Sequence, residues 1–244
     1  MGMQENAIKI AVCDDETWFA EQLKQKIETL AEKAEWKVEV DAYDQTDTFL
    51  KSDIRQYQLL FLDVRMESLD GIQMARELRK QKIQAMIIYV SAYIEMAPQG
   101  YEVHAFRYLL KQDLDRSLPY TLKEAVEELA YRRKTYEIHA QGRTDLIPLR
   151  DIIYIESFKR IVVFHTKDRS SKEYRRLSDL EEELRDSNFI RIQKSYLVNL
   201  DHVAYIEKGE VHMDNEASLP CSKEKYEEII QQYLLWKGRQ IWGF

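Results

Sequence analysis

Acidic residues directly follow two apolar runs in the first half of the chain. Asp14 and Asp15 come after the run from Ile8 to Cys13, and Asp63 comes after the run from Leu59 to Leu62. In a doubly wound parallel sheet the ligand crevice lies outside the carboxyl ends of the strands, so we expect these three carboxylates to converge there. Carboxylates held together repel one another unless a hard cation neutralises them, and Mg²⁺ prefers such oxygen ligands. Asp14, Asp15 and Asp63 are therefore predicted ligands of Mg²⁺.

Further polar residues end the later apolar runs, and together with the carboxylates they could receive a phosphoryl group. Ser91 and Lys111 end the next two runs, and Tyr108 lies three residues before Lys111. In such a site Asp63 would be the nucleophile and would form an acyl phosphate. The Lys111 ammonium would pair with one phosphoryl oxygen and Ser91 would donate its hydroxyl to another. Tyr108 would change rotamer in response, as a switch.

Two other interpretations of these residues remain open at this point. In the first interpretation these residues are ordinary loop acids and a surface lysine with no shared function. That interpretation does not predict that all of them fall at strand ends. A phosphatase of the haloacid-dehalogenase type also forms an aspartyl phosphate, and it uses an acid two residues after the nucleophile. Position 65 is Arg65, and only Asp14, through Glu16, meets that spacing. The spacing therefore disfavours the phosphatase.

Short apolar runs alternate with helical patterns around these residues, which indicates an α/β domain built on a parallel sheet. Apolar residues at helical spacing from Trp18 to Leu30 predict the first helix. The expected strands are 8–13, 38–43, 59–62, 86–90 and 106–110. The expected helices are 18–30, 47–51, 72–78, a short one ending near Pro98 and Gly100, and 118–134. We therefore predict five strands and five helices.

After Tyr136 the pattern changes to period-2 strands separated by turn residues, and this shift marks a domain boundary. The expected strands are 136–140, 152–156, 161–165, 190–193, 203–207, 211–213 and 218–219. One helix is expected at 178–185, where Ser178 and Glu181 have the spacing of a capping box. Another is expected from Ser222 to about Trp236. The second half is thus predicted to be a mainly β domain.

Residues 8–134 resemble the receiver domains of two-component response regulators. The matching residues are Asp14-Asp15, Asp63, Ser91, and Tyr108 with Lys111. The resemblance implies a flavodoxin-like domain over residues 6–134, with Mg²⁺ as cofactor. It also implies a sensor histidine kinase as the partner that donates the phosphoryl group to Asp63.

Two positions depart from the usual pattern of receiver domains. Met66 is followed by Glu67, and Lys111 is followed by Gln112, where proline is common in the family. A cis bond before a residue other than proline costs about 2.5–4 kcal/mol. We therefore expect a trans bond before Gln112 and a changed direction of the Lys111 side chain.

Residues 136–236 are similar to the LytTR family of DNA-binding domains. The signature consists of Ile152 to Ser157, Leu180 and Leu184, Phe189 to Asn199, and Leu219 to Ser222. The resemblance implies a β-rich domain over residues 135–240 whose loops enter successive grooves of double-stranded DNA. By position, the DNA-binding residues are Lys159, Arg160, Arg191, Lys194 and Lys223. Arginine and lysine can reach guanine O6 and N7 or hold phosphates. Asn199 is expected to make a structural hydrogen bond.

The charge of the chain limits how it could bind nucleic acid. The 244 residues carry a net charge of −7, and the part from Tyr136 onward has 17 Lys and Arg against 19 Asp and Glu. A DNA site must therefore be a local basic patch. The acidic total keeps an alternative open, in which the second domain binds protein and the chain is a phosphorylation-gated adaptor.

The compartment follows from the absence of membrane and disulfide patterns in the sequence. No apolar run approaches the roughly 20 residues needed to cross a bilayer, and the first residues lack the pattern of a secretion signal. We therefore expect a cytoplasmic protein that does not bind membranes. Cys13 and Cys221 have neither pairing nor metal-ligand spacing and are expected to be reduced thiols.

Together the two resemblances predict a phosphorylation-controlled transcriptional regulator and not an enzyme. After phosphorylation of Asp63, the face formed by the fourth helix, the last strand and the last helix of the first domain would pair with a second copy. The homodimer would bind repeated promoter sites, because dimerisation raises the effective concentration of the second DNA-binding domain.

Overall fold

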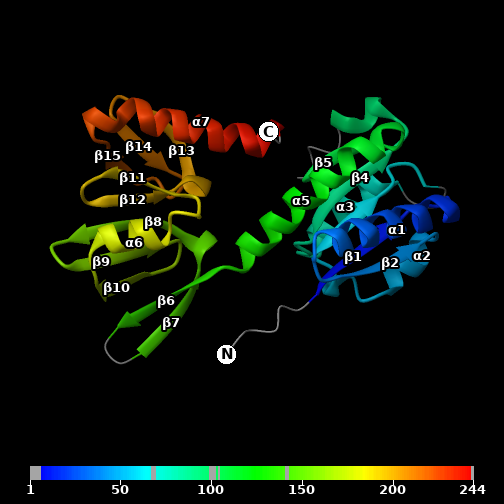
Figure 1. Ribbon diagram of the computed structural model, residues 1–244, viewed down its shortest axis with the longest axis horizontal. Coiled ribbons are helices and arrows are strands. Elements are labelled where there is room, and N and C mark those ends of the chain that lie inside the picture. Colours follow the sequence, from blue (N-terminus) through cyan, green and yellow to red (C-terminus); the bar gives the residue numbers. More distant parts are fainter. Residues whose placement is uncertain (1–6, 67–69, 99–102, 104, 141–142, 243–244) are drawn as a thin grey trace. The chain divides into compact units, whose positions relative to one another are not determined.

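A computed structural model describes residues 7–242 except 67–69, 99–102, 104 and 141–142 (Figure 1). The chain forms two compact units, Met1–Glu127 and Glu128–Phe244. The division between these units falls inside a helix, whereas the sequence places the domain boundary after that helix, between residues 134 and 135. The functional boundary at that position stays a prediction.

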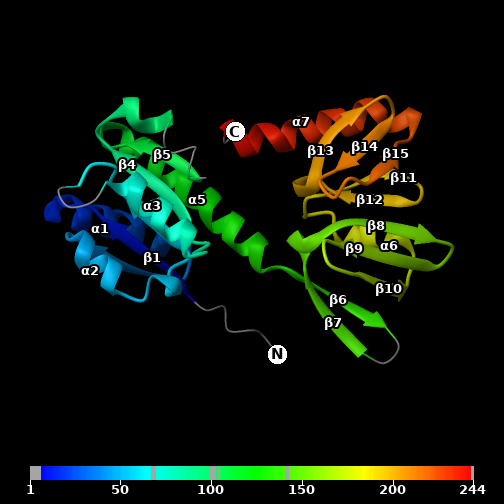
Figure 2. The same cartoon turned by 180° about the vertical axis from the view of Figure 1, so that it is seen from behind.

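The first unit is built on a parallel sheet with the strand order β2-β1-β3-β4-β5 (Figures 1 and 2). Its strands are β1 (Ile8–Cys13), β2 (Val38–Tyr43), β3 (Leu59–Leu62), β4 (Met86–Ser91) and β5 (Arg107–Leu110). Every residue of β3 and β4 is buried, as expected for central strands of a sheet that is covered on both faces. This confirms the predicted five-stranded parallel sheet.

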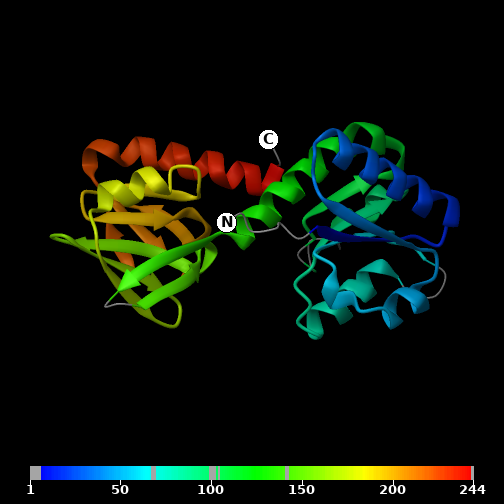
Figure 3. The ribbon, with the colours of Figure 1, turned by 60° about the horizontal axis from the view of Figure 1, so that its bottom comes forward.

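Helices cover both faces of this sheet. They are α1 (Thr17–Lys33), α2 (Thr46–Lys51), α3 (Gly71–Lys80) and α5 (Leu114–Arg133), with short 3₁₀ turns η1 (Ile54–Gln56), η2 (Ile94–Met96) and η3 (Lys111–Asp113). Figure 3 shows α1 (blue) and the first part of α5 (green) on one face, and α2 and α3 (cyan) on the other. The predicted fourth helix extends toward Gly100, which lies outside the described residues.

Two details of these helices differ from the sequence prediction. Trp18 is 63% exposed, so the buried face of α1 begins at Phe19 and not at Trp18. The helix α5 begins at Leu114, four residues earlier than expected. Leu114 and Leu118 are both buried, and this burial favours the earlier start.

The second unit consists mainly of antiparallel sheets. The strand orders are β10-β9-β8-β12-β11, β13-β14-β15 and β6-β7. The strands are β6 (Thr135–Ala140), β7 (Arg143–Pro148), β8 (Ile152–Phe158), β9 (Ile161–Thr166), β10 (Ser170–Tyr174), β11 (Phe189–Gln193), β12 (Tyr196–Asn199), β13 (Val203–Glu207), β14 (Glu210–Met213) and β15 (Ser218–Pro220). The helices are α6 (Leu177–Glu183) and α7 (Tyr226–Trp242), with 3₁₀ turns η4 (Leu149–Asp151), η5 (Leu200–His202) and η6 (Lys223–Lys225). This confirms the β-rich second domain.

Three strands of this unit, β7, β10 and β12, were not expected from the sequence. The first two are polar and lie at sheet edges, where alternation of apolar residues is weak. The predicted capping box is also wrong: Arg176 is the N-cap of α6, and the Ser178 hydroxyl donates to the Asp179 carboxylate. The buried Asn199 makes the expected structural hydrogen bonds, donating to the carbonyls of Leu149 and Ile152.

No helix among the described residues is both long and apolar enough to cross a membrane. Cys13 and Cys221 are buried and unpaired, as expected. Burial raises the pKa of the Cys13 thiol to about 12, and nearby carboxylates add to the effect. Burial also raises the pKa of the Cys221 thiol. Both residues are therefore protonated thiols at neutral pH.

Candidate functional site

Three carboxylates meet at the carboxyl end of the sheet in the first unit. Asp14 directly follows β1, Asp63 directly follows β3, and Glu16 lies just before α1. One oxygen of each lies within 4.8 Å of the others, and Asp14 and Asp63 are buried. The geometry thus brings together two of the three predicted metal ligands. The exposed Asp15 does not belong to this group, and Glu16 completes it instead.

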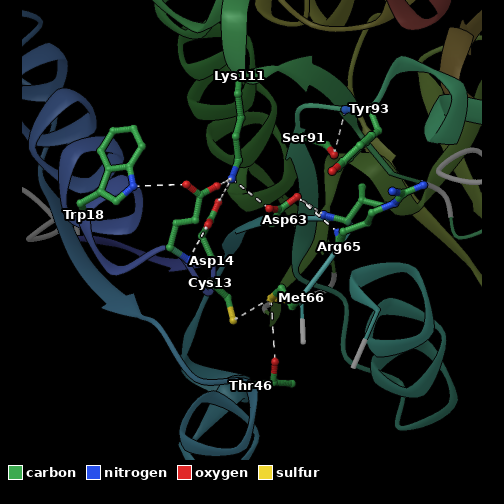
Figure 4. Close-up of polar contacts among 12 residues, drawn as sticks. Cys13, Asp14, Trp18, Thr46, Asp63, Arg65, Met66, Ser91, Tyr93 and Lys111 are labelled. Carbon is green, nitrogen blue, oxygen red and sulfur yellow. Dashed lines mark hydrogen bonds and ion pairs between the residues drawn. The ribbon is translucent and has the colours of Figure 1, made fainter. Parts of the chain in front are cut away.

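The ammonium of Lys111 lies between these carboxylates (Figure 4). Its Nζ atom is 2.8 Å from Asp14 Oδ2, 2.9 Å from Asp63 Oδ2 and 2.9 Å from Glu16 Oε1. Burial lowers the pKa of Lys111, but the hydrogen bonds to the carboxylates outweigh it and raise the pKa above its usual value. Burial raises the pKa of Asp14 to about 6, against the opposing effect of Lys111. Lys111 is therefore a permanently charged partner of the cluster.

Gln112 in place of proline was expected to change the direction of the Lys111 side chain. The described part of the chain contains no cis peptide bond, so the bond before Gln112 is trans, as expected. Nevertheless the Lys111 ammonium lies 2.9 Å from Asp63 Oδ2, and Lys111 is the first residue of η3. Its Nζ atom also lies 4.2 Å from the centroid of the Phe19 ring, a cation–π contact.

Backbone amides fix the other oxygen of Asp63. Its Oδ1 atom accepts hydrogen bonds from the N–H groups of Val64, at 2.6 Å, and Arg65, at 3.3 Å. The loop that carries these amides packs against Gly71, the first residue of α3. A Cβ atom at Gly71 would lie 2.0 Å from the Asp63 carbonyl oxygen, so only glycine fits there. The Asp63 carboxylate is thus held between backbone donors and Lys111.

The predicted hydroxyl residues Ser91 and Tyr108 lie on neighbouring strands and both contact Tyr93. The Ser91 side chain is buried, and its Oγ atom accepts a hydrogen bond from the Tyr93 N–H at 3.3 Å. The Tyr108 hydroxyl donates to the Tyr93 carbonyl. Burial raises the pKa of Tyr108. The guanidinium of Arg65 lies 3.9 Å from the Tyr93 ring centroid, so Tyr93 connects Ser91 and Tyr108 with the loop after Asp63.

Four of the five predicted basic residues of the second unit lie in three turns. Lys159 and Arg160 form the turn between β8 and β9, Lys194 lies in the turn between β11 and β12, and Lys223 begins η6; all four are exposed. Backbone hydrogen bonds connect these turns. The Ser157 N–H donates to the Ser195 carbonyl at 2.8 Å, and the Ser222 N–H donates to the Ile192 carbonyl at 2.8 Å. Figures 1 and 2 show the three turns at the same end of the unit.

Arg191 differs from the other basic residues because its guanidinium contacts the protein itself. It donates to Glu181 at 2.6 Å, to the Lys194 carbonyl at 2.6 Å and to the Gln193 carbonyl at 3.2 Å. Its side chain is 21% exposed. Arg191 therefore fixes the turn that carries Lys194.

The sequence matches two family models. The response regulator receiver domain matches residues 10–122, and the LytTr DNA-binding domain matches residues 142–233. The chain is a LytTR-type response regulator. Its similarity to several curated relatives extends over nearly the full length. The sensory transduction protein LytT of Bacillus subtilis (strain 168) is 26% identical over 238 residues, which are 91% of this chain and 97% of LytT.

A second curated relative agrees with this family. The transcriptional regulatory protein YpdB of Escherichia coli (strain K12) is 22% identical over 245 residues, covering 92% of this chain and 98% of YpdB. Among solved structures, the response regulator protein TrrA from Thermotoga maritima, in complex with Mg(2+)-BeF, is 29% identical with a TM-score of 0.41. It covers 50% of this chain and 98% of TrrA.

The LytTR-type response regulator is thus a transcriptional regulator with a receiver domain and a DNA-binding domain, as predicted, and the adaptor alternative has no support from the relatives. Three residues of its receiver site were missed from the sequence as site members: Glu16, Arg65 and Tyr93. Glu16 could have been found from its place two residues after Asp14. Arg65 and Tyr93 carry no comparable signal, because only the folded loops bring them together.

Proposed function

We propose that Asp63 accepts a phosphoryl group from a sensor histidine kinase, and that this modification controls binding of the LytTR domain to repeated promoter sites. The observation that carries this proposal is the arrangement around Asp63. One carboxylate oxygen accepts two backbone N–H groups, and the other lies 2.9 Å from the Lys111 ammonium. A protein that regulates transcription in this way would act in the cytoplasm, where its DNA lies.

The chemistry would consist of one displacement at phosphorus. An oxygen of the ionised Asp63 carboxylate forms a bond to the phosphorus of the kinase phosphohistidine, and the phosphorus–nitrogen bond breaks with its electron pair moving to the histidine nitrogen. Lys111 would pair with a phosphoryl oxygen, since its ammonium already lies beside Asp63. Ser91 would donate its hydroxyl to a second oxygen.

The donor set at this site fits Mg²⁺. All candidate ligands are carboxylate oxygens, and the single ammonium of Lys111 cannot neutralise the three acids that surround it. We propose Asp14 and Asp63 as ligands, with Asp15 as the third acid expected from the family. When bound, Mg²⁺ offsets the negative charge of the phosphoryl oxygens.

The signal would leave the site through Ser91, Tyr93 and Tyr108. A Ser91 hydroxyl that turns toward the phosphoryl group gives up its contact with the Tyr93 N–H. The loop that carries Tyr93 would then shift, and Tyr108, which donates to the Tyr93 carbonyl, would change rotamer with it. The face around the predicted fourth helix, β5 and α5 would form the homodimer.

For DNA, we propose that Lys159, Arg160, Lys194 and Lys223 are the contacting residues. The hydrogen bonds between their turns support a single surface. Arg191 would act by holding the turn of Lys194 in place, since three of its hydrogen bonds go to protein atoms. Whether each cation reads a guanine or holds a phosphate depends on the site sequence.

The phosphoacceptor is tested by incubating the full chain with a small-molecule phosphoryl donor and Mg²⁺, and by locating the modification with mass spectrometry. Wild type should gain one phosphoryl group on Asp63, and Asp63→Asn should gain none. Asp53→Asn is the matched control, because Asp53 is an exposed acid of the same unit that lies before η1. Equal modification of wild type and Asp63→Asn would refute the assignment.

A further inference from the structure

Large apolar side chains are exposed on the hairpin formed by β8 and β9. Phe158 is 69% exposed, Ile161 is 41% exposed, and Tyr174 on the neighbouring strand β10 is 71% exposed. Ile161 is paired directly with Phe158 on one side and with Tyr174 on the other, so the three residues share one face of the sheet. The adjacent residue Val162 is fully buried on the opposite face. An exposed apolar cluster of this kind is typical of an interaction site.

The two aromatic residues of this cluster contact the basic side chains of the turn. The Lys159 Nζ atom lies 5.6 Å from the centroid of the Phe158 ring. The Arg160 guanidinium donates a hydrogen bond of 3.3 Å to the Tyr174 hydroxyl. The cluster therefore presents two cations beside two aromatic side chains.

The turn between β8 and β9 places Lys159 at its tip, beside the turn of Lys194. Lys159 has a φ of 60°, in the left-handed region that favours glycine. The same conformation occurs at Glu35, Lys82, Lys208 and Glu216. The role of Lys159 is therefore indicated by its charge and its neighbours and not by its φ angle. The turn also lies beside that of Lys194, because the N–H of Ser157 donates to the carbonyl of Ser195.

These charges indicate which partner covers the cluster. A polyanion complements Lys159, Arg160 and the neighbouring Lys194, whereas a second copy would bring the same positive charges against them. One acid on this face, Glu156, accepts a hydrogen bond from the Tyr196 hydroxyl at 3.0 Å and keeps its negative charge, but the three cations outnumber it. Double-stranded DNA is therefore the occupant that the cluster fits.

We propose that Phe158 and Tyr174 belong to the DNA-contacting surface. Phe158 makes an apolar contact with a thymine methyl group in the groove that the hairpin enters, a pairing that aromatic side chains make with this base. Tyr174 is a positioning residue, whose hydroxyl orients the Arg160 guanidinium toward the DNA. This inference rests on the proposed role of the β8–β9 turn in DNA binding.

The test uses the full-length protein and a duplex selected by it from random DNA. Affinities are measured over a range of salt concentrations for wild type, Phe158→Ala, Tyr174→Phe, Lys159→Gly and Arg160→Ala, with Leu146→Ala as control. Leu146 is 56% exposed on β7 and lies outside the cluster. Phe158→Ala should weaken binding about tenfold with an unchanged salt dependence, because no cation is removed.

Replacing thymines of the duplex by uracils removes only their methyl groups. At the contacted position this replacement should weaken binding by wild type and leave binding by Phe158→Ala unchanged. Tyr174→Phe should weaken binding in the wild-type background and should have no effect in Arg160→Ala, because the hydroxyl acts through that guanidinium. Circular dichroism and thermal unfolding establish that each variant is folded.

The outcomes separate this inference from the proposed function. If Arg160→Ala weakens binding while Phe158→Ala and Tyr174→Phe bind as wild type, the turn contacts DNA and the aromatic residues do not. If Lys159→Gly and Arg160→Ala also bind as wild type, the proposed role of the turn itself is wrong. A change of oligomeric state in Phe158→Ala with unchanged DNA affinity would make the cluster an interface between copies and would overturn the inference.

Discussion

Asp14 carries a charge that the folded protein disfavours. Its side chain is 2% exposed, and burial raises its pKa from 3.8 to about 6 although Lys111 lowers it. When the pKa of a carboxyl group is higher in the folded than in the unfolded state, protonation of that group stabilises the folded state. That contribution is complete below the unfolded value of 3.8 and is lost as the pH rises through about 6.

The substitution Asp14→Asn is therefore expected to stabilise the first unit at neutral pH. The gain should be about 1–3 kcal/mol near pH 8 and should vanish near pH 4, where Asp14 itself is protonated. Urea unfolding in the presence of a chelator, at both pH values, measures it. Asp15→Asn is the control, because Asp15 is exposed. A stabilisation that is equal at both pH values would contradict the role of the buried charge.

Lys111 keeps its contacts with the acidic cluster although Gln112 replaces the usual proline. A redirected lysine was expected because Gln112 stands where proline is common. The sequence alone does not show which direction the Lys111 side chain takes when the bond before Gln112 is trans. In the structure the ammonium still lies 2.8–2.9 Å from three carboxylates. Electrostatic attraction to a buried acidic cluster is sufficient to fix a flexible lysine side chain there.

Among the elements, the start of α3 is the one most closely bound to the site. The helix begins at Gly71, whose amide donates to the Val64 carbonyl at 3.0 Å, and Asp70 accepts a hydrogen bond from Ile72 N–H at 2.6 Å as its N-cap. The Asp63 carbonyl occupies the space that a side chain at Gly71 would need. The loop of the phosphoacceptor and the helix therefore share one conformation.

Gly71→Ala should disturb both stability and phosphorylation. A methyl group 2.0 Å from the Asp63 carbonyl oxygen must push the loop away. We expect a destabilisation of about 1–3 kcal/mol. Denaturant unfolding measures the stability, and mass spectrometry measures phosphoryl incorporation. Gly238→Ala is the control, because a Cβ atom there meets nothing within 4 Å; inside α7 it should leave the stability unchanged or raise it by up to about 1 kcal/mol. A fully phosphorylated and equally stable Gly71→Ala would show that the contact does not matter.

The elements also show what a single sequence can and cannot reveal. Continuous apolar runs such as β3 and β4 are visible because both faces of a central parallel strand are buried. The strand β10 cannot be recognised from apolar alternation in the sequence, because its buried residue is Glu173. This side chain accepts a hydrogen bond from the Tyr136 hydroxyl. The contact partner of such a residue is far away in the sequence, so local periodicity misses it.

The candidate site was predictable for the same reason that the central strands were. Asp14, Asp63, Ser91 and Lys111 each lie at the end of an apolar run, and the sheet then brings the strand ends together. Glu16 and Arg65 lie in loops, where the direction of a side chain depends on tertiary contacts. In the second unit, the structural role of Arg191 depends on Glu181 from α6 and could not be read from its own strand.

For the whole molecule, a net charge of −7 has to be reconciled with DNA binding. The proposed contacts are few and confined to turns, so a moderate salt dependence is expected. Lys194→Ala should lower the slope of log affinity against log salt by about 0.9 if Lys194 holds one phosphate. Fluorescence anisotropy with a labelled duplex measures it.

Lys167→Ala serves as the matched control for Lys194→Ala. Lys167 is an exposed lysine in the turn between β9 and β10, at the opposite end of β9 from the turn of Lys159. Its removal should leave the slope unchanged. Equal slopes together with equal affinities for wild type and Lys194→Ala would place the DNA away from the β11–β12 turn.

The most direct test of control by Asp63 is DNA binding by the full-length protein with and without a phosphoryl donor and Mg²⁺. Wild type and Asp63→Asn are titrated against a duplex with two half-sites, and the oligomeric state is followed by sedimentation. We expect the donor to increase the affinity and the dimer fraction of wild type and to leave Asp63→Asn unchanged. Control by Asp63 is refuted if Asp63→Asn binds and dimerises as the phosphorylated wild type does, or if the donor changes neither property of wild type.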